Sequence, residues 1–216
     1  MLGVLIGGLL SVGCVAEIKS PENETPPQQE PPPPVSTENV VVSTKARIRF
    51  LGGQRYAMRL SEGLDLARQE VCRELGSFDC ANEAHNIVLG GVDAEKLGFF
   101  EPLPQTAIST PFAADRIALS ACSKVAEREL STPENAALFQ LYADQNGQVD
   151  DDDPALAIAV RELYVRVLQR QPSDDERAAL LALYPAIKAT GTAQAAYDWA
   201  VATCFAVSTT EEALFY

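Results

Sequence analysis

Apolar residues recur three or four positions apart along most of the chain after residue 45, which is the period of an amphipathic helix. The first such stripe predicts a helix that ends at Gly76 and comprises Leu60, Leu64, Ala67, Val71 and Leu75. A second stripe predicts a helix that ends near Leu130 and comprises Ile117, Ala121 and Val125. Alternation with a period of two is almost confined to residues 40–42 and 47–51. The pattern therefore predicts a mostly α fold, a compact multi-helix domain over residues 45–216.

Three more helices are predicted after residue 150. The first runs from Leu156 to Leu168, where apolar residues line one face, and it is broken by Gln171 and Pro172. Ser173 and Glu176 have the spacing of a capping box, which predicts that the next helix begins there and runs to about residue 189. The last predicted helix carries Ala196, Trp199 and Thr203.

The one long irregular segment lies between the first two predicted helices, at about residues 78–112. It is rich in glycine and proline, and loops of this length in a compact domain are commonly functional. We therefore expect any recognition surface to include this loop, with Gly90, Gly91, Phe99 and Phe100 as candidate recognition residues.

The first 13 residues are apolar and uncharged, and Cys14 follows them. Such a run is too short to cross a membrane as a helix, which needs about 20 residues, but it has the length of a signal-peptide core. Residues 10–14 read Leu-Ser-Val-Gly-Cys and resemble the lipobox of bacterial lipoproteins. The resemblance implies that residues 1–13 are a signal peptide and that Cys14 is lipidated. An ordinary secretory signal and a buried apolar N-terminus are the alternatives.

Residues 14–44 have the composition of a tether, with several prolines among Glu, Gln, Ser and Thr. A segment of this kind buries too little apolar surface to offset its ordering entropy, so we expect it to be disordered. The run Pro31–Pro34 has a second interpretation, as a ligand for a proline-recognition domain. Among lipoproteins, a residue such as Val15 after the lipidated cysteine favours the outer membrane, facing the periplasm or the surface.

Composition argues against several function classes. The chain has 30 acidic and 17 basic residues and a net charge of −13, whereas nucleic-acid binding requires clustered Lys and Arg. It holds one histidine, His85, and neither a nucleophile-elbow motif nor a haem-attachment motif occurs. We therefore expect no nucleic-acid partner and no cofactor, and we assign no catalytic residue.

The sequence offers two possible metal sites, and both are disfavoured. A zinc site of Cys72, Cys80 and His85 would need reduced thiols and a fourth ligand. The acidic run that begins at Asp144 matches the EF-hand pattern at only its first and third positions. An acidic turn that caps the helix beginning near Pro154 is the better interpretation of this run.

The remaining cysteines favour export, because Cys72, Cys80, Cys122 and Cys204 are an even number, as expected in an oxidising compartment. Three pairings are possible. Cys72 and Cys80 flank a predicted helix end, while Cys122 and Cys204 lie on the inward sides of two predicted helices. These positions favour disulfides 72–80 and 122–204, and the alternative is that some of the four are free buried thiols.

The segment Glu162–Glu176 resembles a helix–break–helix motif of uncharacterised secreted bacterial proteins, which are often fused to, or encoded with, c-type cytochrome domains. The match rests on Leu163, Tyr164, Arg166, Leu168, Arg170, Pro172, Ser173 and Glu176. The ending, from Trp199 to Phe215, is similar to the closing helix of the same proteins, so the resemblance covers about 60 residues. It implies a helical exported domain in a multi-protein envelope system.

These patterns together favour a membrane-anchored envelope lipoprotein whose helical domain docks a partner protein and is not an enzyme. The alternative is a small envelope enzyme, or a ligand- or glycan-binding protein, that uses acidic residues near the 78–112 loop.

Overall fold

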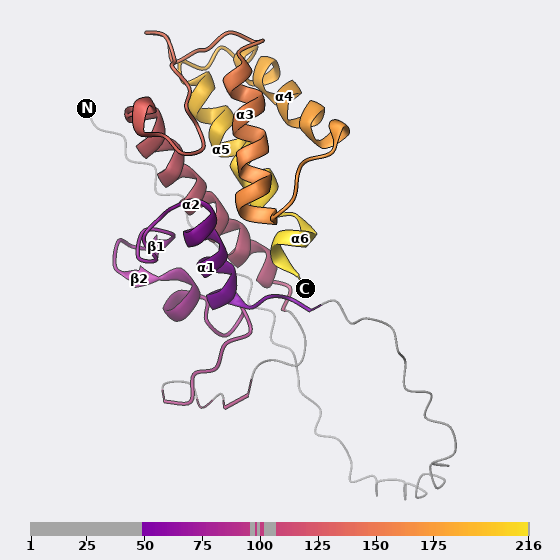
Figure 1. Ribbon diagram of the computed structural model, residues 1–216. Helices are drawn as coiled ribbons and strands as arrows, with labels where there is room; N and C mark the ends of the chain where they lie inside the picture. Colours follow the sequence, from indigo (N-terminus) through magenta and orange to yellow (C-terminus); the bar gives the residue numbers. More distant parts are fainter. Residues whose placement is uncertain (1–48, 96–97, 99, 102–106, 216) are drawn as a thin grey trace, which may run out of the picture. The chain divides into compact units, whose positions relative to one another are not determined.

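Helices α2 (Thr110–Ser131) and α5 (Ala195–Ser208) pack against each other at the centre of the fold (Figure 1). Their buried faces are rich in alanine, which lets the two backbones approach closely, and the Cys122–Cys204 disulfide joins them. The computed structural model describes residues 49–95, 98, 100–101 and 107–215, and this part of the chain is mostly helical, as predicted. The predicted signal peptide, Cys14, the tether and the boundary at residue 45 lie outside the described residues.

Helices α3 (Pro154–Leu163) and α4 (Asp174–Lys188) complete the C-terminal half. Asp153 caps α3 by accepting a hydrogen bond from the Ala155 N–H, and the predicted capping box of Ser173 and Glu176 is present at the start of α4. Trp199 of α5 is fully buried, and its indole N–H donates to the backbone oxygen of Leu180 in α4 at 2.9 Å. Burial of this ring joins α4 to α5.

The predicted helix over residues 156–168 is confirmed, but its last turns are wider than an α-helix. A π-helix, η3 (Tyr164–Leu168), continues α3, and Gln169 ends it with a φ of 60°. A short helix, α6 (Glu211–Leu214), closes the chain next to η3. Phe50 forms a single antiparallel bridge with Phe215, so the described N-terminal residues lie beside the C-terminus.

The predicted helix through Leu60 and Leu75 is wrong beyond Gly63. Helix α1 (Gly53–Gly63) ends in a Schellman motif, in which the Leu66 N–H donates to the Ser61 oxygen and Asp65 has a φ of 52°. Arg128 of α2 then donates to the Asp65 oxygen and holds this end in place. The apolar residues after Gly63 are nevertheless buried. A turn, and not a helix, carries Leu64, Leu66 and Val71 into the core.

A buried carboxylate fixes the chain after α2 and the short 3₁₀-helix η2 (Pro133–Asn135). Glu129 is 2% exposed, and one of its oxygens accepts the backbone N–H groups of Leu138 and Phe139 at 2.8 and 2.7 Å. Arg128 donates to its other oxygen. These bonds satisfy donors that burial would otherwise leave unpaired. Among the described residues, no helix is long and apolar enough to cross a membrane.

Candidate functional site

The first candidate binding surface is built on a two-stranded hairpin that a disulfide closes. Strands β1 (Arg73–Glu74) and β2 (Phe78–Asp79) pair antiparallel, and the predicted Cys72–Cys80 disulfide closes the hairpin at its base. The π-helix η1 (Cys80–Ala84) follows at once, and the Asp79 carboxylate caps it by accepting the N–H groups of Ala81 and Asn82. The hairpin is therefore fixed at both of its strands.

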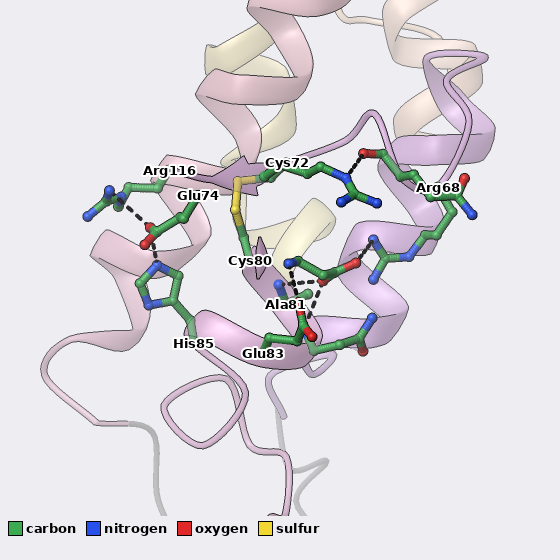
Figure 2. Close-up of a disulfide and its surroundings, with 12 residues drawn as sticks. Arg68, Cys72, Glu74, Cys80, Ala81, Glu83, His85 and Arg116 are labelled. Atoms are coloured by element: carbon green, nitrogen blue, oxygen red, sulfur yellow. Dashed lines mark hydrogen bonds and ion pairs between the residues drawn. A yellow bond between two sulfur atoms is a disulfide. The ribbon is translucent and has the colours of Figure 1, made fainter. Parts of the chain in front are cut away.

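Glu74 connects the hairpin to the rest of the domain. Figure 2 shows His85 and Arg116 both pointing toward its carboxylate, with His85 Nε2 at 2.7 Å and Arg116 at 2.9 Å. His85 follows η1 and Arg116 lies on α2, so this cluster ties three elements together. In the described part of the chain, no serine, threonine or cysteine side chain is hydrogen-bonded to the His85 ring. The cluster therefore positions the hairpin and holds no nucleophile.

Exposed apolar side chains surround this hairpin. Leu75 at its tip is 90% exposed, Phe78 is 51% exposed, and Leu119 of α2 is 50% exposed. Leu75 and Leu119 line one cavity of about 370 Å³ between the hairpin and α2. Phe112 lies seven residues before Leu119 on the same face of α2 and is also exposed. We call the surface of Leu75, Phe78, Phe112 and Leu119 the hairpin face.

Leu75 occupies a backbone conformation that leucine disfavours. Its φ is 52° and that of Gly76 is 73°, so both residues at the tip are left-handed. Turns of this kind prefer Asn followed by Gly, because Asn tolerates the left-handed region. Here the position carries a large apolar side chain that is 90% exposed, so it contributes little to folding.

The candidate recognition residues of the 78–112 loop are only partly described. Gly90 has a φ of 80°, and a side chain at Gly91 would collide with Asn86, whose amide donates to the Val92 oxygen. Both glycines therefore have conformational roles in a turn. Phe100 is exposed, whereas Phe99 lies outside the described residues. The role of these four residues in recognition stays a prediction.

A groove between α1 and η3 is the second feature. Its volume is about 650 Å³, and we call it the arginine groove because Arg55, Arg59 and Arg166 line it. Leu51, Met58, Val165 and Val167 supply its apolar surface, with Glu62 as its one acidic residue. A cationic groove of this size is unexpected on a chain with a net charge of −13.

Two of the acidic residues considered for other chemistry, Asp144 and Glu83, hold the backbone through hydrogen bonds. Asp144 accepts the N–H groups of Asn146 and Gln148, which lowers its pKa, with the bond from Gln148 as the main cause. Glu83, near the start of the 78–112 loop, accepts the Asp79 N–H at 2.7 Å. Over the described residues, no group of three or more His, Cys, Asp or Glu side chains is placed to hold a metal ion.

No family model, no curated protein and no solved structure matches this chain. The resemblance of residues 162–176 to secreted, cytochrome-associated proteins therefore stays a prediction. In the structure, Arg170 of that segment pairs with Glu176, whereas Arg166 lines the arginine groove.

The binding potential of Leu75, Arg55 and Arg166 was not predicted from the sequence. Leu75 was assigned to an apolar helix face, although the glycine directly after it is typical of a hairpin turn. Arg55 and Arg59 have the spacing of neighbours on one helix face, but the sequence does not reveal that η3 packs beside that face.

Proposed function

We propose that this protein is an envelope lipoprotein whose helical domain docks a partner protein through the hairpin face. The observation that carries the proposal is the exposed, left-handed Leu75 beside Leu119 and Phe78. Neither the conformation nor the exposure of Leu75 favours folding, so contact with a partner is the explanation that accounts for both.

The hairpin face is well suited to docking because it is already ordered. The Cys72–Cys80 disulfide and the Glu74 cluster fix the hairpin, so binding orders few additional groups. The partner that fits is a protein segment with an apolar side chain that enters the cavity between Leu75 and Leu119. Arg116 is 64% exposed at the rim and offers donors to a carboxylate beside that side chain.

Site-specific photo-crosslinking in intact cells tests this proposal. A crosslinking amino acid at Phe112 or Leu119 should give one discrete adduct, while the same group at Ile158 on α3 should give none. Ile158 is a matched control because it is 51% exposed, much like Leu119, but lies outside the hairpin face. Leu75→Asn should reduce the Leu119 adduct about tenfold, the effect expected when a binding contact of about 1.4 kcal/mol is lost.

The Leu75→Asn variant separates docking from folding. Because Asn is better suited to the left-handed position, its midpoint of thermal unfolding should equal or exceed that of the wild type. Equal adduct yields at Ile158 and Leu119, or an unchanged Leu119 adduct in a folded Leu75→Asn chain, would contradict docking through the hairpin face.

A further inference from the structure

We propose that the arginine groove is a second binding site, separate from the hairpin face, and that it takes an extended acidic peptide segment of a protein. The groove is defined by α1 on one wall and η3 on the other. The inference does not depend on the hairpin face, because none of the four residues that define that surface lines the groove.

The charges in the groove are available for a ligand. Within the described residues, the side chains of Arg55 and Arg166 form no hydrogen bond or ion pair. Arg59 uses one nitrogen to donate to the backbone oxygens of Glu212 and Ala213, which leaves its other donors free. Unpaired guanidinium groups bind carboxylates well, because each presents two parallel donors to the two carboxylate oxygens.

The shape of the groove favours an extended chain over a small enclosed molecule. Five of the ten residues that line it are exposed, namely Arg55, Met58, Glu62, Val165 and Gln169, so a small ligand would remain largely in solvent. Arg55 and Arg59 are one helical turn apart on one wall, and Arg166 lies on the other. Side chains of an extended peptide point alternately to opposite sides, so acidic residues in it can reach both walls.

The two walls are held at a fixed distance. A Cβ atom on Gly63 would lie 3.2 Å from both the Arg166 oxygen and a methyl group of Val167, so α1 and η3 approach as closely as a glycine allows. Arg59 also ties α1 to α6. The groove is therefore present before any ligand binds, which lowers the entropic cost of binding.

Fluorescence anisotropy with the purified full chain tests the proposal. The probe is a fluorescein-labelled nonapeptide with three repeats of Glu-Glu-Leu, at an ionic strength of about 0.15 M. We expect saturable binding that Arg55→Glu or Arg166→Glu weakens at least about tenfold, since each variant replaces an attraction by a repulsion. Arg166→Lys keeps the charge but loses the paired donors, so it should weaken binding less than Arg166→Glu.

Arg161→Glu is the matched control, because it makes the same charge change on α3 at a residue that is 56% exposed and lies outside the groove. It should leave the affinity within about twofold of the wild type, as a change in a distant surface charge is screened by salt. Leu75→Asn should also leave peptide binding unchanged, which makes this test independent of the hairpin face. Thermal unfolding of each variant verifies that the domain is intact.

Three results would overturn the inference. The first is the absence of saturable binding, and the second is equal weakening by Arg161→Glu and Arg166→Glu, which would indicate attraction to net charge alone. The third is binding to phosphatidylglycerol vesicles that depends on Arg166 while the peptide does not bind. That result would assign the groove to the membrane surface.

Discussion

Arg170 joins three elements of the C-terminal half through a single side chain. Its guanidinium forms two hydrogen bonds with Glu176 at 2.8 and 2.6 Å and a third with Glu212 at 2.8 Å. It also lies over the ring of Tyr164, 5.1 Å from the ring centroid. Arg166, only four residues earlier, has no such partner and faces the arginine groove. Arg170 therefore has a structural role, whereas Arg166 is available to bind a ligand.

The Arg170–Glu176 pair predicts a specific pH dependence of stability. The hydrogen bonds from Arg170, and then those from Ser173, lower the pKa of Glu176 to about 2 from its usual 4.5. Because the folded pKa lies below the unfolded one, the pair stabilises the fold above about pH 4.5, and this contribution is lost as the pH falls toward 2. We expect Glu176→Gln to lower the free energy of unfolding at pH 7 and to have progressively less effect below pH 4.5.

Urea unfolding at pH 7, 4 and 2.5 measures this difference. Glu134→Gln serves as the control, since Glu134 is an exposed glutamate with no ion pair in the described part of the chain. The size of the effect is limited by solvent, because the Glu176 side chain is about one third exposed. A difference between wild type and Glu176→Gln that stays constant from pH 7 to pH 2.5 would contradict the assigned cause.

At the scale of elements, the two disulfides have different structural roles. The Cys122–Cys204 disulfide joins α2 to α5 across a sequence separation of 82, whereas Cys72–Cys80 closes a separation of 8 within one hairpin. A longer closed loop restricts the unfolded chain more, so the first disulfide should contribute more to stability. The second instead fixes the local shape of the hairpin face.

This contrast gives a measurable prediction. The double variant Cys122→Ala and Cys204→Ala should lower the free energy of unfolding by about 4.5 kcal/mol, and Cys72→Ala with Cys80→Ala by about 2.5 kcal/mol. Urea unfolding of the two double variants compares these values directly. Equal losses for the two pairs would show that loop length does not govern their contributions.

The accuracy of the sequence predictions differed between elements for identifiable physical reasons. The break after residue 168 and the boundaries of α4 were predicted correctly, because Gln171–Pro172 and the Ser173–Glu176 capping box act locally. The end of α1 was wrong because Asp65 adopts a left-handed conformation that Arg128, 63 residues away, helps to hold. A contact so distant in the sequence leaves no periodic pattern near the helix end.

Over the whole of the described domain, we find two surfaces with binding potential. The hairpin face is apolar and the arginine groove is cationic, so each fits a different kind of protein segment. A domain of this kind can engage two segments of one partner, or two partners.

The proposed lipid anchor at Cys14 predicts where the whole chain is found after cell lysis. If Cys14 carries the lipid, Cys14→Ser should move the chain from the membrane fraction to the soluble fraction of lysed cells, because a lipidated cysteine is the proposed membrane attachment. Detergent phase partitioning of both chains measures this. A wild-type chain that partitions into the aqueous phase with four free thiols would contradict the lipobox and export predictions together.

The amino-acid sequence was enough to predict the helical class and most helix boundaries of the C-terminal half, and it favoured the two disulfide pairings that the structure contains. These follow from periodicity, capping residues and the positions of four cysteines, all of which act over short distances or through simple constraints. Only the tertiary structure decided that Leu75 stands exposed on a hairpin and that Arg55 and Arg166 line one groove. Surfaces of this kind arise where segments far apart in the chain pack together, and no local pattern encodes that packing.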